Sequence, residues 1–179
     1  MSDKFRIGVF SSGNGSNFEA IVKADIPNVE VSFLLCNIED AYVLERAKNF
    51  SIDSILLPHK NFESRKDFEK EIISRIQDYD VDLIILAGFK RILSPFFINY
   101  FEKKIINLHP SLLPSFPGLR APKQALEYGV KFTGCTVHFV DDGVDTGPII
   151  LQGLIEILDS DDEEKDNINL DSDNEEKDN

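Results

Sequence analysis

Apolar runs typical of strands alternate along the chain with stretches whose apolar residues recur at helical spacing. The runs predict strands at residues 6–10, 29–36, 54–57, 83–86, 104–108, 136–140 and 149–157. Helices are predicted to begin near Asn17, Tyr42, Ser64, Pro95 and Pro122. This alternation is typical of an α/β domain built on a mostly parallel sheet. Only a short loop separates the last two strands, which predicts that they pair antiparallel.

The chain has 179 residues, a length that suits one domain with a substantial core. Its net charge of −13 is uneven, because residues 159–179 contain eleven Asp or Glu and two Lys. Residues 158–167 also recur as 170–179 with one change. Such an acidic segment cannot bury enough apolar surface to offset its ordering entropy, and two copies do not make a solenoid. We therefore expect a folded domain over 1–158 and a disordered acidic tail over 159–179.

Composition also limits the partners and the compartment. The acidic balance argues against nucleic-acid binding, which needs a basic surface. No apolar run reaches membrane-spanning length and the first residues form no signal peptide, so a cytoplasmic protein without a membrane partner is expected. Cys36 and Cys135 stand in apolar surroundings, which predicts two buried, reduced thiols; a disulfide between them is the alternative.

The strongest candidate for chemistry is the segment Asn-Leu-His-Pro at residues 107–110, where a predicted strand ends. Residues i and i+2 of a strand point to the same face, so Asn107 and His109 are expected to share one pocket. An amide donor beside an imidazole suits a reaction in which a carbonyl oxygen becomes an anion. A strand end with two polar caps is the alternative, which this segment alone does not exclude.

A second candidate is the turn Ser-Gly-Asn-Gly-Ser-Asn at residues 12–17, between a predicted strand and a predicted helix. Free backbone N–H groups and the helix dipole make such a turn an anion site. Phe18 stands where the dinucleotide fingerprint needs its third glycine, and no Gly-Lys-Ser/Thr completes a P-loop. The turn therefore fits a single phosphate better than a dinucleotide; an ordinary glycine turn is the alternative.

Ligands of parallel α/β sheets bind at the carboxyl ends of the strands. The 13–17 turn, the 87–91 segment, the Asn107–His109 pair and the 141–148 loop would gather at that edge. Two glycines and a proline give the loop a tight path, which can push one of its carboxylates inward. The alternative for this loop is a solvated acidic turn.

Together these segments resemble the phosphoribosylglycinamide formyltransferase family, which transfers a formyl group from 10-formyltetrahydrofolate to glycinamide ribonucleotide in purine biosynthesis. The matching stretches keep the family's order and are 12–17, 44–47, 86–94, 107–118 and 136–152. The signature Asn-x-His-Pro-Ser-Leu-Leu-Pro is shared with other formyl-tetrahydrofolate enzymes, whereas the Gly-Asn-Gly-Ser-Asn turn favours this family. The resemblance implies an α/β, single-domain, Rossmann-like formyltransferase fold.

The resemblance also implies roles for individual residues. The catalytic set would be Asn107, His109 and Asp145. The phosphate of the ribonucleotide would be held by Gly15, Ser16 and Asn17. The folate site would be lined by Arg65, Lys90, Arg91, Ile92, Leu93, Asn107, Asp141, Asp142, Gly143, Val144 and Asp145. The implied partners are glycinamide ribonucleotide and 10-formyltetrahydrofolate as co-substrate, with no metal and with a monomer or homodimer as the assembly.

The implied mechanism is direct transfer without a covalent enzyme intermediate. The substrate amine would attack the formyl carbon, and Asn107 with a protonated His109 would stabilise the resulting oxyanion. Asp145 would hold His109 and favour its charged form. A proton would pass from the amine to the folate nitrogen through His109, Asp145 and a water molecule.

Three alternatives remain open. A related formyl-folate enzyme would bring another domain, RNA-binding and C-terminal in methionyl-tRNA formyltransferase, regulatory and N-terminal in formyltetrahydrofolate deformylase. A metal hydrolase would use His109, His138 and an aspartate of the 141–145 loop, although no recognised ligand spacing supports it and His138 fits a structural strand residue. A catalytically impaired member is the third, because the acidic duplication stands where the family has a C-terminal helix with a Glu-His pair.

Overall fold

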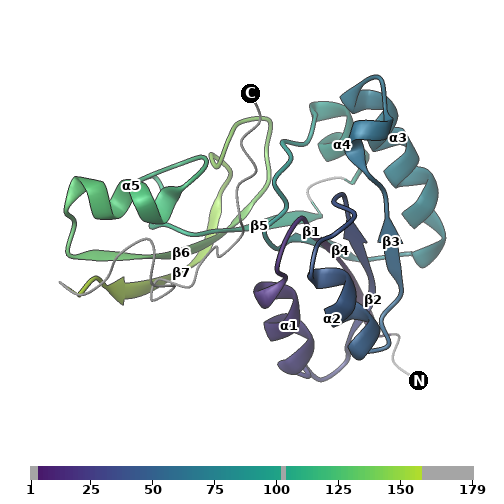
Figure 1. Cartoon of the computed structure of the whole chain (residues 1–179), viewed down its shortest axis with the longest axis horizontal. Helices are drawn as coiled ribbons and strands as arrows, with labels where there is room; N and C mark the ends of the chain where they lie inside the picture. The colour runs from purple at the N-terminus through teal and green to yellow at the C-terminus, as the bar shows by residue number, and fades with distance from the viewer. Residues whose placement is uncertain (1–3, 102–103, 159–179) are drawn as a thin grey trace. The chain divides into compact units, whose positions relative to one another are not determined.

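The computed structural model describes residues 4–101 and 104–158, in which strands and helices alternate as the sequence predicts (Figure 1). The strands are β1 Phe5–Ser11, β2 Val29–Cys36, β3 Ser54–Leu56, β4 Leu83–Leu86, β5 Ile105–His109, β6 Phe132–Phe139 and β7 Ile149–Glu156. The helices are α1 Ser16–Lys23, α2 Val43–Asn49, α3 Arg65–Ile76, α4 Pro95–Tyr100 and α5 Ala121–Tyr128, with 3-10 turns η1 His59–Asn61 and η2 Gln77–Tyr79. The tail predicted to be disordered lies outside the described residues.

The strands form one mixed sheet in the order β3-β2-β1-β4-β5-β6-β7. β1 pairs in parallel with β2 and with β4, and β2 pairs in parallel with β3. β6 and β7 are antiparallel. The predicted fold class is therefore confirmed, including the antiparallel pair near the C-terminal end. The chain divides into two compact units, Met1–Ile106 and Asn107–Asn179, with the boundary inside β5.

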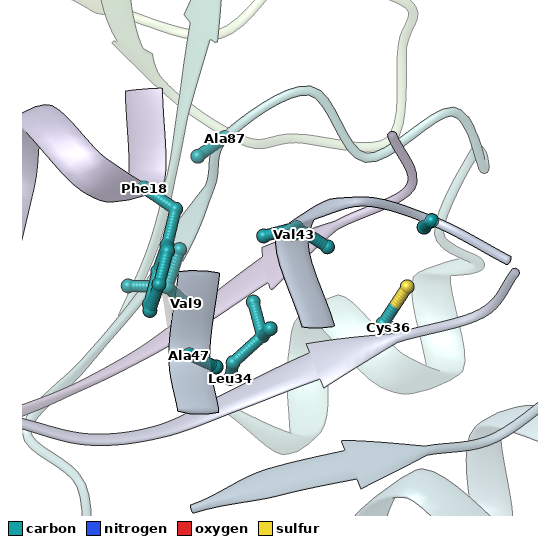
Figure 2. Close-up of a cluster of buried hydrophobic side chains, with 8 residues drawn as sticks. Val9, Phe18, Leu34, Cys36, Val43, Ala47 and Ala87 are labelled. Atoms are coloured by element: carbon teal, nitrogen blue, oxygen red, sulfur yellow. The ribbon is translucent and has the colours of Figure 1, made fainter. Parts of the chain in front are cut away.

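The core of the first unit lies on both faces of its parallel strands. Neighbouring strand residues point to opposite faces, so Val9 packs with Leu34 and Phe18 of α1, while Phe10 contacts the rings of Phe33 and Phe97. Figure 2 shows the first of these clusters, in which α1 and α2 close over β1 and β2. Because both faces are covered, β1 is buried over five consecutive residues instead of alternating.

Two helices in the first unit begin at caps that satisfy their first N–H groups. Ser64 caps α3, and its Oγ accepts from the Asp67 N–H at 3.2 Å. Ser94 caps α4, with Pro95 at the first helical position, where its missing N–H costs nothing. These caps account for helix starts that the sequence predicts near Ser64 and Pro95.

The second unit contains the one strand whose predicted start is clearly wrong. β6 begins at Phe132 and not at residue 136, because it pairs with β7 as far as Glu156. The early part contains Gly134, which lowers its strand signal, yet a Cβ there would lie 1.8 Å from the carbonyl oxygen of Gly153. Close approach of the two strands therefore requires this glycine, and pairing, not local propensity, extends the strand.

The structure also bears on two expectations from the sequence, the state of the cysteines and the lack of a membrane span. Neither cysteine forms a disulfide, as predicted, but only Cys36 is buried; Cys135 is half-buried and lies opposite Gly153 on β7. In the part of the chain that the structure describes, no helix is long and apolar enough to cross a membrane.

Candidate active site

The second unit brings the three proposed catalytic side chains together. Asn107 and His109 both extend from β5, and Asp145 lies in the loop between β6 and β7. Nδ1 of His109 is 3.3 Å from Oδ2 of Asp145, and their side chains are only 5% and 12% exposed. Nδ2 of Asn107 is 3.4 Å from Oδ1 of the same carboxylate. The cluster combines an amide, an imidazole and a shielded carboxylate.

Asp145 is oriented by a main-chain donor at a turn of the loop. Its φ of 55° is in the left-handed region, which Asp and Asn adopt more often than other non-glycine residues. The Gly118 N–H donates to Oδ2 at 2.8 Å. Burial by itself raises the pKa of Asp145, but hydrogen bonds from His138 and Gly118 and the nearby charges of His109 and His138 lower it below its ordinary value. The carboxylate is therefore ionised at neutral pH.

His109 meets an oxygen acceptor on each side of its ring. Nδ1 faces Asp145, and Nε2 lies 2.9 Å from the carbonyl oxygen of Phe116. Ser111 fixes the same segment, because its Oγ donates to the carbonyl of Ser115 at 2.6 Å. With two acceptors, the ring can donate from both nitrogens when it carries a positive charge. The geometry thus suits an imidazolium at this position.

His138 belongs to the same cluster, although the sequence analysis considered it only as a possible metal ligand or as a structural strand residue. Its Nε2 lies 3.2 Å from Nδ2 of Asn107 and 3.6 Å from Oδ1 of Asp145, and Nδ1 lies 2.9 Å from the carbonyl oxygen of Phe139. Burial lowers the pKa of His138, but Asp145, the Phe139 backbone and the charge of Asp141 together raise it above the ordinary value. The available signal was that β6 follows β5 in the sheet, so an inward His on β6 can reach an inward Asn on β5.

The rest of the loop after β6 is arranged around its own acidic residue. Oδ1 of Asp141 accepts from the Gly143 N–H at 3.1 Å and from Oγ1 of Thr146 at 2.7 Å. Asp142, Gly143 and Val144 are exposed. Asp145 is thus the carboxylate of this loop that turns inward. The remaining proposed folate residues of the loop line its outer part.

In the first unit, the proposed phosphate turn leads directly into α1. Gly15 is the N-cap residue, with φ 78° and no side-chain cap, Ser16 is exposed and Asn17 is half-buried. A helix of this kind leaves N–H groups of its first turn for another acceptor, and its dipole favours an anion there. The turn can therefore hold a phosphate oxygen through the main chain.

The same unit places the 88–90 segment beside this turn. The Ser12 N–H donates to the carbonyl of Gly88 at 3.0 Å, and the Lys90 N–H donates to Oγ of Ser12 at 2.9 Å. Oγ of Ser12 in turn donates to Oδ1 of Asn37 at 2.6 Å. The prediction that the turn and this segment gather at one edge agrees with these contacts. That the Asn107–His109 pair joins them stays a prediction.

The proposed folate residues of the first unit differ in exposure. Lys90, Arg91 and Ile92 are exposed, Leu93 is buried, and Arg65 is exposed at the start of α3. One turn further along α3, the buried Glu69 accepts hydrogen bonds from the N–H and the Oγ of Ser94. This pair anchors the end of the Lys90–Leu93 segment to α3.

The two histidines of the cluster raise the alternative of a metal site. Within residues 4–101 and 104–158, no group of three or more His, Cys, Asp or Glu has an arrangement that would hold a metal ion. His109 and His138 contact opposite oxygens of Asp145. The described cluster is therefore organised as a hydrogen-bonded network around one carboxylate.

Comparisons with known proteins agree on one family. The sequence profile of the formyl transferase family matches residues 5–176. The chain is 46% identical over 159 residues to phosphoribosylglycinamide formyltransferase of Bacillus subtilis (strain 168), covering 87% of this chain and 82% of that protein. It is 44% identical over 164 residues to the trifunctional purine biosynthetic protein adenosine-3 of Drosophila melanogaster, covering 89% of this chain but only 12% of that protein. The crystal structure of glycinamide ribonucleotide transformylase 1 from Symbiobacterium toebii matches with a TM-score of 0.85 at 44% identity, over 90% of this chain and 78% of that one.

Proposed function

Since the chain belongs to the formyl transferase family, and within it to the phosphoribosylglycinamide formyltransferases, we propose that it transfers the formyl group of 10-formyltetrahydrofolate to the amine of glycinamide ribonucleotide. The observation that carries the proposal is the His109 ring, held between Oδ2 of Asp145 and the Phe116 carbonyl, on the same strand as Asn107. This arrangement offers to a developing oxyanion an amide and an imidazole whose two nitrogens both face oxygen atoms.

In the proposed reaction, the amine nitrogen forms a bond to the formyl carbon and the bond from that carbon to the folate nitrogen breaks. Asn107 and the imidazolium of His109 stabilise the tetrahedral oxyanion by donating hydrogen bonds. For this, Nε2 of His109 exchanges the Phe116 carbonyl for the oxyanion, while Asp145 keeps its hold on Nδ1. The proton lost by the amine reaches the folate nitrogen by way of His109, Asp145 and water.

The binding roles are assigned to each unit separately. Gly15, Ser16 and Asn17 bind the phosphate through the first turn of α1. The proposed folate-binding residues are Arg65 and the Lys90–Leu93 segment in the first unit, and Asn107 and the Asp141–Asp145 loop in the second unit. No metal takes part, and both substrates are small molecules. We also propose that the protein is cytoplasmic and is a monomer or a homodimer.

An acceptor comparison tests this function. The purified chain is mixed with 10-formyltetrahydrofolate and either glycinamide ribonucleotide, methionyl-tRNA or no acceptor, and the loss of the formyl-folate is followed. We expect turnover with glycinamide ribonucleotide alone. Formate release without an acceptor would indicate a deformylase, and turnover with methionyl-tRNA would indicate the tRNA-modifying enzyme. A cooperatively folded chain that binds folate without turnover would be an impaired family member.

A further inference from the structure

The 44–47 stretch matches the family pattern, yet the proposed reaction assigns it no role. Its Arg46 lies in α2 with a side chain that is 20% exposed. We propose that Arg46 is a positioning residue. It fixes the orientation of the peptide groups in the phosphate-binding turn at residues 13–17. This inference rests on the proposed function, because it concerns how that turn receives the phosphate of glycinamide ribonucleotide.

The guanidinium of Arg46 reaches one residue of the turn with two donors. Nε donates to the carbonyl oxygen of Asn14 at 2.9 Å, and Nη2 donates to Oδ1 of Asn14 at 2.6 Å. The group also forms an ion pair with Glu19 and lies 4.9 Å from the ring centre of Tyr42. Because these contacts hold the planar guanidinium on three sides, it loses little further entropy when it binds Asn14. It therefore defines the position of Asn14 closely.

The contacts from α2 decide which way the peptide groups of the turn point. The Val43 N–H donates to the carbonyl of Gly13 at 3.0 Å, and Arg46 takes the next carbonyl, that of Asn14. Two successive carbonyl oxygens therefore point toward α2. A carbonyl oxygen directed at a phosphate would repel it, whereas N–H groups attract it. Arg46 thus keeps an acceptor away from the anion and leaves the N–H groups of residues 15–17 to face it.

The ion pair with Glu19 has a second consequence for the same site. Glu19 lies in the first turn of α1, where it favours the helix but also places a negative charge near a bound phosphate. Lys23 also pairs with Glu19, but its side chain is 63% exposed, so solvent screens that contact. Arg46, at 20% exposure, neutralises the carboxylate more effectively. Loss of Arg46 would therefore weaken phosphate binding through both geometry and charge.

The test compares Arg46→Met, Arg46→Lys and the control Arg75→Met. Arg75 forms an exposed i,i+4 pair with Glu71 on α3, so the control removes an Arg–Glu pair remote from the turn in sequence. We expect Arg46→Met to weaken binding of glycinamide ribonucleotide, by KM and by calorimetry, about 10- to 100-fold, the usual range for a lost charged hydrogen bond. The KM for folate and the kcat at saturation should change less than about threefold, because the loss concerns phosphate binding alone.

Arg46→Lys separates geometry from charge. One ammonium cannot reach the Asn14 carbonyl, Asn14 Oδ1 and Glu19 in the way the fork does, so this variant should recover only part of the lost affinity. Arg75→Met should bind like the wild type. Melting curves of all variants show whether the fold is retained.

Two results would overturn the inference. The first is Arg46→Met binding glycinamide ribonucleotide within twofold of the wild type. The second is equal loss of affinity for both substrates together with a lower melting temperature, which would indicate a structural role only. If the wild type turns over and Arg46→Met equals it in ribonucleotide binding and turnover, only the Arg46 role is refuted. A folded wild type that neither binds the ribonucleotide nor turns over would refute the proposed function as well.

Discussion

Nδ1 of His109 lies 3.3 Å from Oδ2 of Asp145, although the first residue is on β5 and the second follows β6. The same oxygen of Asp145 accepts from the Gly118 N–H. One carboxylate oxygen therefore binds both the proposed catalytic ring and the segment that runs from Phe116. This arrangement makes Asp145 the residue on which the geometry of the cluster depends.

Replacing that carboxylate with an amide should remove its charge with little change of shape. We expect Asp145→Asn to lower kcat about 10²- to 10³-fold, because the amide neither stabilises the imidazolium nor assists proton transfer. The KM values should rise less than the kcat falls. Steady-state kinetics with the exposed Asp40→Asn as control measures the effect. A kcat within threefold of wild type would remove Asp145 from the mechanism.

Asp145 should also influence stability in acid. Its pKa in the folded protein is lower than the ordinary value of 3.8, so its stabilising contribution is complete above that pH and is lost as the pH falls through the folded value. Urea unfolding of wild type and Asp145→Asn should therefore differ most near neutral pH and converge below about pH 4. A gap that stays constant down to pH 2 would contradict the ionised, hydrogen-bonded carboxylate.

For His138, the predicted dependence of stability on pH has the opposite direction. Its folded pKa is higher than the ordinary 6.5, so the contribution of its charged form is complete below that value and is lost as the pH rises through the folded value. We expect His138→Phe to lose about 1–3 kcal/mol of unfolding free energy, because Asn107 and Asp145 lose a partner, and to lose less at high pH. Unfolding measured from pH 5.5 to 8.5 tests this. A difference in unfolding free energy between wild type and His138→Phe that increases with pH would contradict this prediction.

Gly15 tests how tightly the phosphate turn is constrained. Its φ of 78° disfavours any side chain, and an added Cβ would lie 2.3 Å from Cγ2 of Val43. Gly129 has the same φ, but nothing lies within 4 Å of its added Cβ. Gly129→Ala should therefore cost about 1–2 kcal/mol for its backbone alone, and Gly15→Ala about 1–3 kcal/mol more for the clash. Equal losses in urea unfolding would show that Val43 yields without cost.

Sequence reasoning recovers the elements that local pattern determines. β2 and β4 match their predicted bounds, and the i, i+2 spacing identified Asn107 and His109 as a pair on one strand face. The start of β6 was missed because pairing with β7 determines it. The contacts of His138 with Asn107 and of Arg46 with Asn14 were not predicted, since these partners lie on other elements. Such contacts depend on the tertiary fold, which local periodicity does not encode.

The most direct test of the whole account is the turnover of His109→Ala with glycinamide ribonucleotide and 10-formyltetrahydrofolate. We expect active wild type and a kcat reduced about 10²- to 10⁴-fold in the variant, with both substrates still bound. His59→Ala, which removes an imidazole hydrogen-bonded to Asn37 in the first unit, should stay within a few-fold of wild type. If His109→Ala turns over as fast as the wild type, the proposed catalytic centre is wrong.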